Sequence, residues 1–166
     1  MRKIGLLSDT HSYYHPRINN FFKEVDEIWH AGDIGNIDIY EQLSAFKPLK
    51  AVYGNIDGSE LRMVLNEIEI FMCEDIKVLL THIGGYPKKY AKGIKQCLID
   101  ENIQLFICGH SHILKVINDT DLKLLHMNPG SAGLQGIHQR ITMLRFTISG
   151  NRIDNLEVFD SPRQIN

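Results

Sequence analysis

Five apolar runs of strand length, spread over the first two-thirds of the chain, each end in side chains that can bind metal ions. The runs show little alternation of apolar and polar residues, which is typical of strands buried on both faces of a sheet. Because ligands collect at the carboxyl ends of strands in open α/β sheets, we expect these polar residues to meet at one edge. They are Asp9 and His11, Asp33, Asn55 and Asp57, His82, and His110 and His112.

The first part of the chain predicts alternating strands and helices. Strands are expected at 3–8, 26–31 and 49–53, and helices at 16–22 and 39–46. Asn36 or Asp38 is the expected cap of the second helix. This βαβαβ order favours a parallel sheet.

The later part is expected to be richer in strands. It predicts a hairpin from 67–73 and 77–81, a helix at 88–102 and a buried strand at 105–108. Further strands are expected at 114–118, 122–128, 139–148 and 152–159, followed by a frayed tail at 161–166. We therefore expect one domain, residues 1–166, of the α+β (mixed α/β) class, with two sheets and outer helices.

Composition excludes several classes of protein. A formal charge of −2 gives no electrostatic footprint for nucleic acid or an anionic membrane. No run approaches the ~20 apolar residues of a membrane helix, and the first apolar run is too short for a signal peptide. The three cysteines lack a metal-binding spacing and are expected to be reduced thiols, which favours the cytoplasm.

The residue types at the five strand ends suit a site for two divalent ions. Such a site needs carboxylate, imidazole and neutral oxygen ligands, one of which bridges. Taken singly, each residue also fits a structural role, because Asp9, Asp33 and Asn55 are common turn residues and His82 suits a buried hydrogen-bonded histidine. Five strand ends that all carry ligand types favour a dinuclear metal centre.

In their order, these segments resemble the motifs of the calcineurin-like metallophosphoesterases. The motifs stand here as Asp9-Thr10-His11, Gly32-Asp33, Gly54-Asn55-Ile56-Asp57, Thr81-His82 and Gly109-His110-Ser111-His112. The chain length and Asn128-Pro129-Gly130-Ser131 are similar to the small phosphodiesterase branch. The resemblance implies a four-layer α-β-β-α sandwich and a metal-dependent phosphodiesterase, in which a metal-bridging hydroxide attacks the phosphodiester.

The resemblance also implies a role for each residue. Asp9, His11, Asp33 and His112 would hold one ion, and Asp33, Asn55, His82 and His110 the other. Asp33, Asn55 and His110 are the implied catalytic residues. Asp57, Asn128 and Ser131 are expected to orient ligands or to contact the phosphate. Manganese is expected ahead of iron, zinc or nickel, all of which accept such ligands.

Two positions depart from the family pattern. Many members have a histidine, which protonates the leaving group, where this chain has Ile56. General-acid help is worth roughly 10²–10⁴-fold, so we expect a good leaving group or another proton donor, although the small branch often lacks this histidine too. After His82, many relatives continue with Gly-His, whereas this chain has Ile83-Gly84.

The remaining histidines are weighed singly. His30 and His126 are expected to pack inside strands, and His15 and His138 are expected in loops. Either loop histidine would suit the missing acid if it faced the site, but exposure at the surface is the favoured interpretation.

Two other functions stay open. One is a phosphomonoesterase of the same fold, and the other is a protein-interaction scaffold resembling the retromer subunit, which has lost part of its metal site. All the ligand positions are filled here, which favours an enzyme acting on a small or nucleotide-like phosphodiester. The sequence identifies neither the physiological substrate nor the native metal, and it leaves homo-oligomerisation open.

Overall fold

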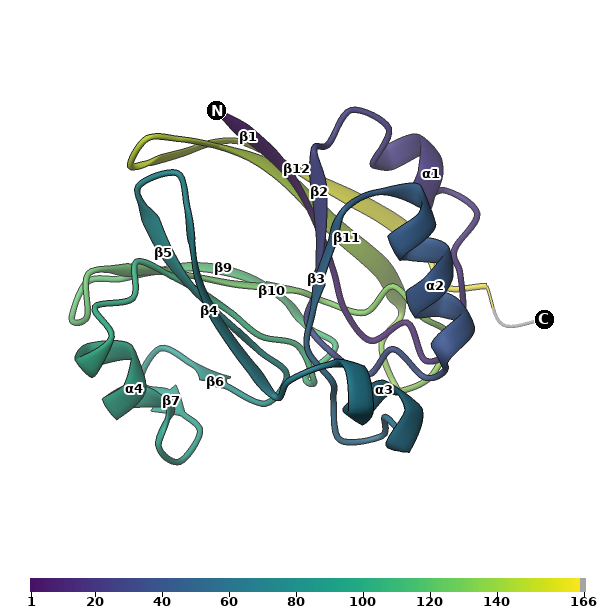
Figure 1. Cartoon of the computed structure of the whole chain (residues 1–166), viewed down its shortest axis with the longest axis horizontal. Coiled ribbons are helices and arrows are strands. Elements are labelled where there is room, and N and C mark those ends of the chain that lie inside the picture. Colours follow the sequence, from purple (N-terminus) through teal and green to yellow (C-terminus); the bar gives the residue numbers. More distant parts are fainter. Residues whose placement is uncertain (165–166) are drawn as a thin grey trace.

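The computed structural model describes residues 1–164 and contains two five-stranded mixed sheets that pack face to face (Figure 1). The strand order is β12-β11-β1-β2-β3 in the first sheet and β4-β5-β8-β10-β9 in the second. The strands of the first sheet are β1 (Arg2–Leu7), β2 (Glu27–His30), β3 (Leu49–Ala51), β11 (Arg140–Ser149) and β12 (Arg152–Pro162). Those of the second are β4 (Ile68–Cys73), β5 (Ile76–Thr81), β8 (Leu105–Ile107), β9 (Leu114–Asp119) and β10 (Leu124–Pro129).

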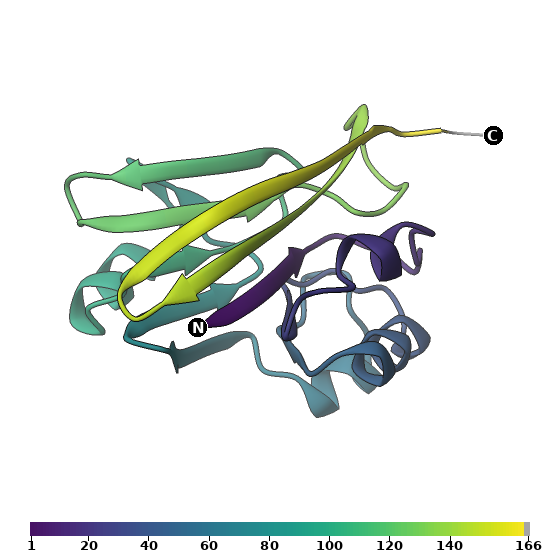
Figure 2. The ribbon, with the colours of Figure 1, turned by 90° about the horizontal axis from the view of Figure 1, so that it is seen from above.

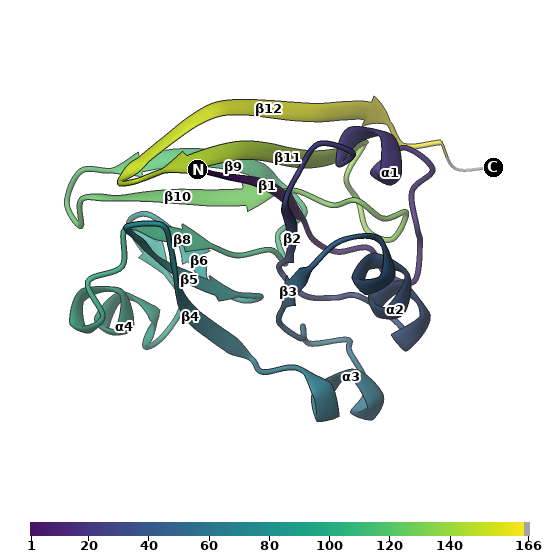
Figure 3. The ribbon, with the colours of Figure 1, turned by 45° about the horizontal axis from the view of Figure 1, so that its top comes forward.

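Helices cover the outer face of each sheet. Helices α1 (Ile18–Phe21) and α2 (Ile37–Phe46) lie beside the first sheet, and α4 (Ile94–Asp100) lies on the opposite side of the molecule, beside the second (Figure 3). Three buried clusters separate these layers: one between the sheets, one beneath α1 and α2, and one beneath α4. The prediction of an α+β four-layer sandwich is confirmed. Within residues 1–164, no helix is long and apolar enough to cross a membrane.

The buried strands explain why the apolar runs do not alternate. On β1, Ile4 and Leu6 face the cluster between the sheets, whereas Leu7 faces the cluster beneath the helices. Trp29 of β2 is fully buried between the sheets, where its ring packs edge-on against Phe71 at 5.1 Å and Phe146 at 5.9 Å. Both faces of these strands are therefore covered by apolar side chains.

Strand direction brings the polar strand ends together. β1, β2 and β3 are parallel to one another, as are β5, β8 and β10. In the long β11–β12 hairpin, β11 runs antiparallel to β1 and β12 pairs with the other edge of β11 (Figure 2). Because parallel strands end at the same edge of a sheet, the loops after β1, β2 and β3 are neighbours. For example, the N–H of Asp9 donates to Gly32 and that of His11 to Asp33, both at 3.0 Å.

The prediction of a helix over 88–102 is wrong at its start. Residues 85–90 form a small hairpin of β6 (Gly85–Tyr86) and β7 (Lys89–Tyr90), and the helix begins only at Ile94. Lys88 (φ 72°) and Gly93 (φ 81°) have left-handed backbone conformations, which interrupt a helix.

Two further expectations need correction. Helix α3 (Ser59–Val64) lies in a segment that the sequence analysis left unassigned. The expected frayed tail is ordered at its start, because Ser161 and Pro162 continue β12 opposite Ile141 and Arg140. Residues 165–166 of that expected tail lie outside the described residues.

Candidate metal centre

Two groups of three side chains lie at the polar strand ends. Asp9, His11 and His112 offer ligand atoms within 4.8 Å of one another, and so do Asp33, His82 and His110. The sequence predicted all six, and the structure brings them together from both sheets. Asn55, the seventh predicted ligand, lines a hollow of about 170 Å³ together with His82.

Most of these residues have a backbone conformation that is uncommon for non-glycine residues. Five of them have a left-handed φ: Asp9 (54°), His11 (45°), Asp33 (53°), His110 (69°) and His112 (59°). Asp and His tolerate this region better than most residues, and such strain concentrates at functional sites. The sharp turn that it produces directs each side chain back across the strand ends.

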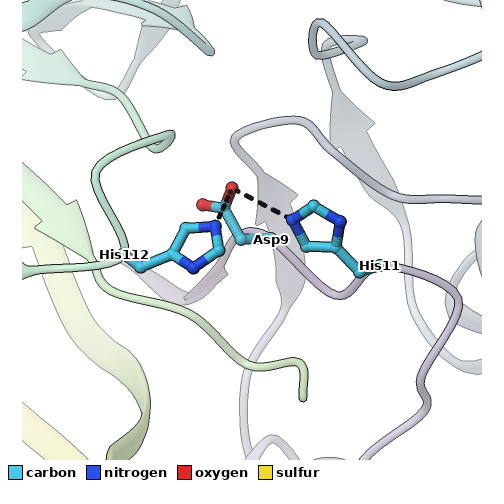
Figure 4. Close-up of side chains that lie close together, drawn as sticks. All are labelled: Asp9, His11 and His112. Atoms are coloured by element: carbon cyan, nitrogen blue, oxygen red, sulfur yellow. Dashed lines mark ion pairs between the residues drawn. The ribbon is translucent and has the colours of Figure 1, made fainter. Parts of the chain in front are cut away.

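Asp9 uses its two carboxylate oxygens differently. Oδ2 accepts hydrogen bonds from the Ser8 hydroxyl at 2.7 Å and the His110 N–H at 3.1 Å. Oδ1 instead faces imidazoles, with His112 Nε2 at 3.1 Å and His11 Nε2 at 3.8 Å (Figure 4). One oxygen therefore holds the loop, and the other is left for a ligand.

Asp33 lies between the two groups. Its Oδ2 is 3.6 Å from His11 Nε2 of the first group and 3.2 Å from His82 Nε2 of the second. Its Oδ1 accepts the N–H of Ile56 at 3.1 Å. A Cβ at Gly54 would lie 2.0 Å from Asp33 Oδ1, so only glycine allows this close approach. The position of Oδ2 suits a carboxylate shared by two ions.

Hydrogen bonds fix the tautomer of His82. Its Nδ1 is 2.7 Å from the carbonyl of Ala31, which can only accept, so Nδ1 carries the proton. In the neutral imidazole, the lone pair of Nε2 then faces Asp33 Oδ2. Two acceptors at 3.2 Å repel each other unless a cation or a proton lies between them.

His138 fixes the tautomer of His112 in the same way. His138 Nε2 donates to the carbonyl of Gly133 at 3.0 Å, and burial lowers the pKa of His138, which keeps it neutral. Its Nδ1 must therefore accept from His112 Nδ1, at 3.0 Å. The lone pair of His112 Nε2 is thereby directed at Asp9 Oδ1. The favoured expectation that His138 is a surface histidine is wrong.

Unpartnered buried atoms indicate that this donor set fits a cation. Within residues 1–164, six buried side-chain N or O atoms lack a hydrogen-bond partner, and three of them are Asp9 Oδ1, His11 Nε2 and His82 Nε2. Burial would raise the pKa of Asp9, but His11 and His112 outweigh it and hold that pKa well below its usual range. Burial would lower the pKa of His82, but Asp33 and Asp9 outweigh it and raise the pKa. The Asp9 shift keeps its carboxylate ionised, and the His82 shift reflects the negative charge of Asp33 and Asp9, which favours a cation at this place.

Each of the three expected supporting residues holds a loop of the candidate metal centre. The Asp57 carboxylate accepts the N–H groups of Ile34, Gly35 and Gly54 at 2.8–3.1 Å, which ties the loops after β2 and β3 together. The orienting role expected of Asp57 toward Asn55 or a ligand histidine stays a prediction, and its bond to the N–H of Gly54 holds the residue next to Asn55.

Asn128 and Ser131 act on the other loops. Asn128 Nδ2 donates to the Gly109 carbonyl at 2.9 Å, and the Ser131 hydroxyl donates to the Asp9 carbonyl at 3.0 Å. Both side chains are buried. The Asn128 bond holds the residue before His110, and a contact of Asn128 with a phosphate stays a prediction.

The other histidines have structural contacts. His30 is fully buried, accepts the N–H of Gly32 at Nδ1, and donates from Nε2 to the Thr10 hydroxyl at 2.9 Å. His126 is buried on the ring of Phe106, as expected. His15 packs against Phe159 and Tyr13 and is largely buried, so the expected surface exposure is wrong for it as well.

Sequence reasoning missed two residues of the site. Ser8 holds Asp9 Oδ2, and His138 directs His112. The only sequence signal for Ser8 is its place beside Asp9. His138 lies in a loop 26 residues from His112, and no motif links the two.

Comparisons with known proteins agree with this geometry. A family model described as the calcineurin-like phosphoesterase superfamily domain matches residues 2–151. A protein of Methanothermobacter thermautotrophicus named as a probable metallophosphoesterase is 28% identical over 156 residues, which covers 91% of this chain and 88% of that protein. Another so named, from Methanocaldococcus jannaschii, is 31% identical over 134 residues and covers 77% and 67%. The crystal structure of Chaetomium thermophilum Vps29 superposes with a TM-score of 0.77 at 14% identity, covering 97% of each chain.

Proposed function

Because this chain belongs to the calcineurin-like phosphoesterase superfamily, we propose that it is a phosphodiesterase that works with two divalent cations. This proposal is carried by two pairs of hydrogen-bond acceptors, each an imidazole nitrogen and a carboxylate oxygen, that face each other at the candidate metal centre. The lone pairs of His82 Nε2 and His112 Nε2 point at carboxylate oxygens only 3.2 and 3.1 Å away. Two cations would turn both repulsive contacts into coordination.

Each ion has a set of protein ligands in this proposal. Asp9, His11, Asp33 and His112 hold one, and Asp33, Asn55, His82 and His110 hold the other. Bound divalent cations supply an activated water at neutral pH and neutralise phosphoryl oxygens. Asp33 fixes the spacing of the two sites, because its Oδ2 faces both groups. Asn55 and His110 are exposed, so they are the ligands that a phosphodiester would meet first.

The leaving group is expected to depart with little help from the protein. Ile56 occupies the position of the usual acid, and only its backbone N–H contributes, by holding Asp33. The preference for diesters follows the resemblance to the small phosphodiesterase branch. Manganese as the activating ion and a cytoplasmic location are further predictions.

The scaffold alternative is favoured less. The likeness to Vps29, at 14% identity, concerns the fold alone. This chain retains all seven predicted ligands, and the six His and Asp side chains among them converge. A phosphomonoesterase remains the second candidate, because the same cation site accepts a phosphoryl group from either kind of ester.

The proposed function is tested by hydrolysis of bis(p-nitrophenyl) phosphate and of p-nitrophenyl phosphate. Chelator-stripped protein is assayed with and without Mn²⁺, alongside Asp33→Asn, which keeps the size and the left-handed preference of the residue but removes its charge. We expect Mn²⁺-dependent diester turnover that falls by about 10²–10³-fold in Asp33→Asn, as for loss of a principal electrostatic group.

Asp100→Asn is the matched control, since Asp100 is exposed at the end of α4, on the outer side of the second sheet. Faster turnover of the monoester would replace the diesterase with a phosphatase. Folded protein with no turnover of either ester with Mn²⁺, Fe²⁺, Zn²⁺ or Ni²⁺ would refute the enzyme and favour the scaffold.

A further inference from the structure

A second hollow adjoins the candidate metal centre on the side of His110. It has a volume of about 110 Å³, and its lining includes His110, Ser111, Lys115, Asn128 and Tyr86. This volume equals that of roughly three to four liquid water molecules. The hollow therefore has room for one compact group beside whatever occupies the metal centre.

Lys115 brings a positive charge without a counter-ion into this hollow. Its side chain is half-buried on β9, and Nζ lies 3.3 Å from the centre of the Tyr86 ring. No carboxylate of residues 1–164 forms an ion pair with it. A half-buried ammonium group that contacts only an aromatic face is incompletely compensated, so it favours an anion nearby.

Ser111 supplies a hydrogen-bond donor at the same place. Its Oγ accepts from Asn128 Nδ2 at 3.1 Å and from the N–H of Ile113 at 3.3 Å. Both lone pairs of the hydroxyl are thus engaged, and its proton is left to donate. The hollow therefore combines a cation and an O–H donor, which together suit a phosphate.

The hairpin that carries Tyr86 adds positive charge to this part of the molecule. The β6–β7 hairpin, residues 85–90, contains Lys88 and Lys89 and no Asp or Glu. Lys77 lies earlier in the same stretch of chain but is paired with Glu101 at 2.7 Å. The two hairpin lysines favour the approach of an anion.

We propose that this hollow, which we call the Lys115 subsite, binds a second phosphate group of the substrate while the metal centre holds the scissile phosphodiester. The inference rests on the proposed function and narrows it. The substrate class is a phosphodiester that carries a further phosphomonoester on one of its alcohol arms, as a nucleotide with a terminal phosphate does. A phosphate accepts from both Lys115 and Ser111, and the Tyr86 ring limits the size of the group.

The test compares p-nitrophenyl thymidine 5′-phosphate with and without a 3′-phosphate. We expect the 3′-phosphorylated ester to have the higher kcat/KM. Lys115→Met keeps the apolar stem on Tyr86 and removes the charge, so it should reduce the preference for the 3′-phosphate about tenfold or more, mainly through KM. Lys115→Arg should retain most of the preference, and Lys23→Met, on the far side of the first sheet, is the matched control.

A binding measurement separates this inference from the proposed function. Calorimetric titration with thymidine 3′,5′-bisphosphate and with thymidine 5′-monophosphate needs no turnover. Tighter binding of the bisphosphate that is lost in Lys115→Met supports the subsite even if neither ester is hydrolysed. Equal affinity for both nucleotides, or an unchanged preference in Lys115→Met, would overturn the subsite even if diester hydrolysis is confirmed.

Discussion

A single residue outside the ligand set, His138, decides how His112 presents its lone pair. The neutral His138 ring donates from Nε2 to the Gly133 carbonyl at 3.0 Å, so its Nδ1 accepts a hydrogen bond from His112 Nδ1. We therefore predict that His138→Leu weakens Mn²⁺ binding about 10–100-fold, the usual effect of losing a partner that orients a ligand. His138→Gln offers both an acceptor and a donor and should restore much of the affinity. Calorimetric Mn²⁺ titration measures both; equal affinity of wild type and His138→Leu would contradict this role.

His126 makes stability depend on pH far from the metal centre. Burial lowers its pKa to about 4, against an ordinary value of 6.5, and it donates only to the Phe106 carbonyl. The unfolded chain therefore binds more protons between these pH values, so this stability is present above pH 6.5 and is lost as pH falls toward 4. We predict a loss of about 2 kcal/mol between pH 7 and pH 5 from this residue.

Urea unfolding of metal-free wild type and His126→Leu at several pH values measures this contribution. Between pH 7 and pH 5, wild type should lose about 2 kcal/mol more free energy of unfolding than His126→Leu, because leucine has no proton to bind. A difference independent of pH would show that His126 is not the titrating group. His30, whose pKa burial also lowers to about 4, should leave a residual dependence in the variant.

The ligand residues were accessible from the sequence because each directly follows an apolar run. The supporting residues were not, since Ser8 and His138 act through contacts that have no fixed spacing in the chain. The contacts of Asp57 could not be predicted either, although its place in the motif is recognisable. It accepts the N–H groups of Ile34 and Gly35, and these hydrogen bonds depend on how two loops pack.

At the scale of the elements, the loop after β3 must approach the loop after β2 very closely. Gly54 faces Asp33, whereas a Cβ at Gly58, at the start of α3, would meet no atom within 4 Å. We predict that Gly54→Ala displaces the Asp33 carboxylate and lowers both Mn²⁺ affinity and turnover at least tenfold. Gly58→Ala should change neither by more than about twofold. Calorimetry and the diester assay measure both, and equal behaviour of the two variants would exclude the close approach as a requirement.

Element prediction succeeded where periodicity and capping agreed. The Asn36 side chain accepts from the N–H of Ile39 at 3.1 Å, as expected of the cap of α2. It failed over 88–102, where the apolar spacing of Tyr90, Ile94 and Leu98 suggests one helix. Tyr90 belongs instead to β7, and its hydroxyl donates to Asp119 of the neighbouring sheet, a tertiary contact that local spacing does not reveal.

At the scale of the whole molecule, the candidate metal centre joins the two sheets. Asp9, His11 and Asp33 follow strands of the first sheet, while His82 and His110 follow strands of the second. Elsewhere the sheets contact each other through the apolar cluster around Trp29 and through hydrogen bonds such as that from the Asp75 N–H to the Gly150 carbonyl. Ions at this place would therefore add a further link between the sheets, and they would compensate a site where unpartnered acceptors face one another.

This arrangement predicts that metal stabilises the entire fold. At a free Mn²⁺ concentration about 100-fold above Kd, each ion that binds the native state adds about 2.7 kcal/mol, so one bound ion already corresponds to a rise in Tm of about 5–10 °C for a chain of this size. Differential scanning calorimetry of chelator-stripped protein with and without Mn²⁺ measures the shift, and Asp33→Asn should lose most of it. Trp29 fluorescence and far-UV circular dichroism should shift together, because the ions link both sheets. If Mn²⁺ raised the melting temperature in only one of these signals, or in neither, bound metal would not link the two sheets.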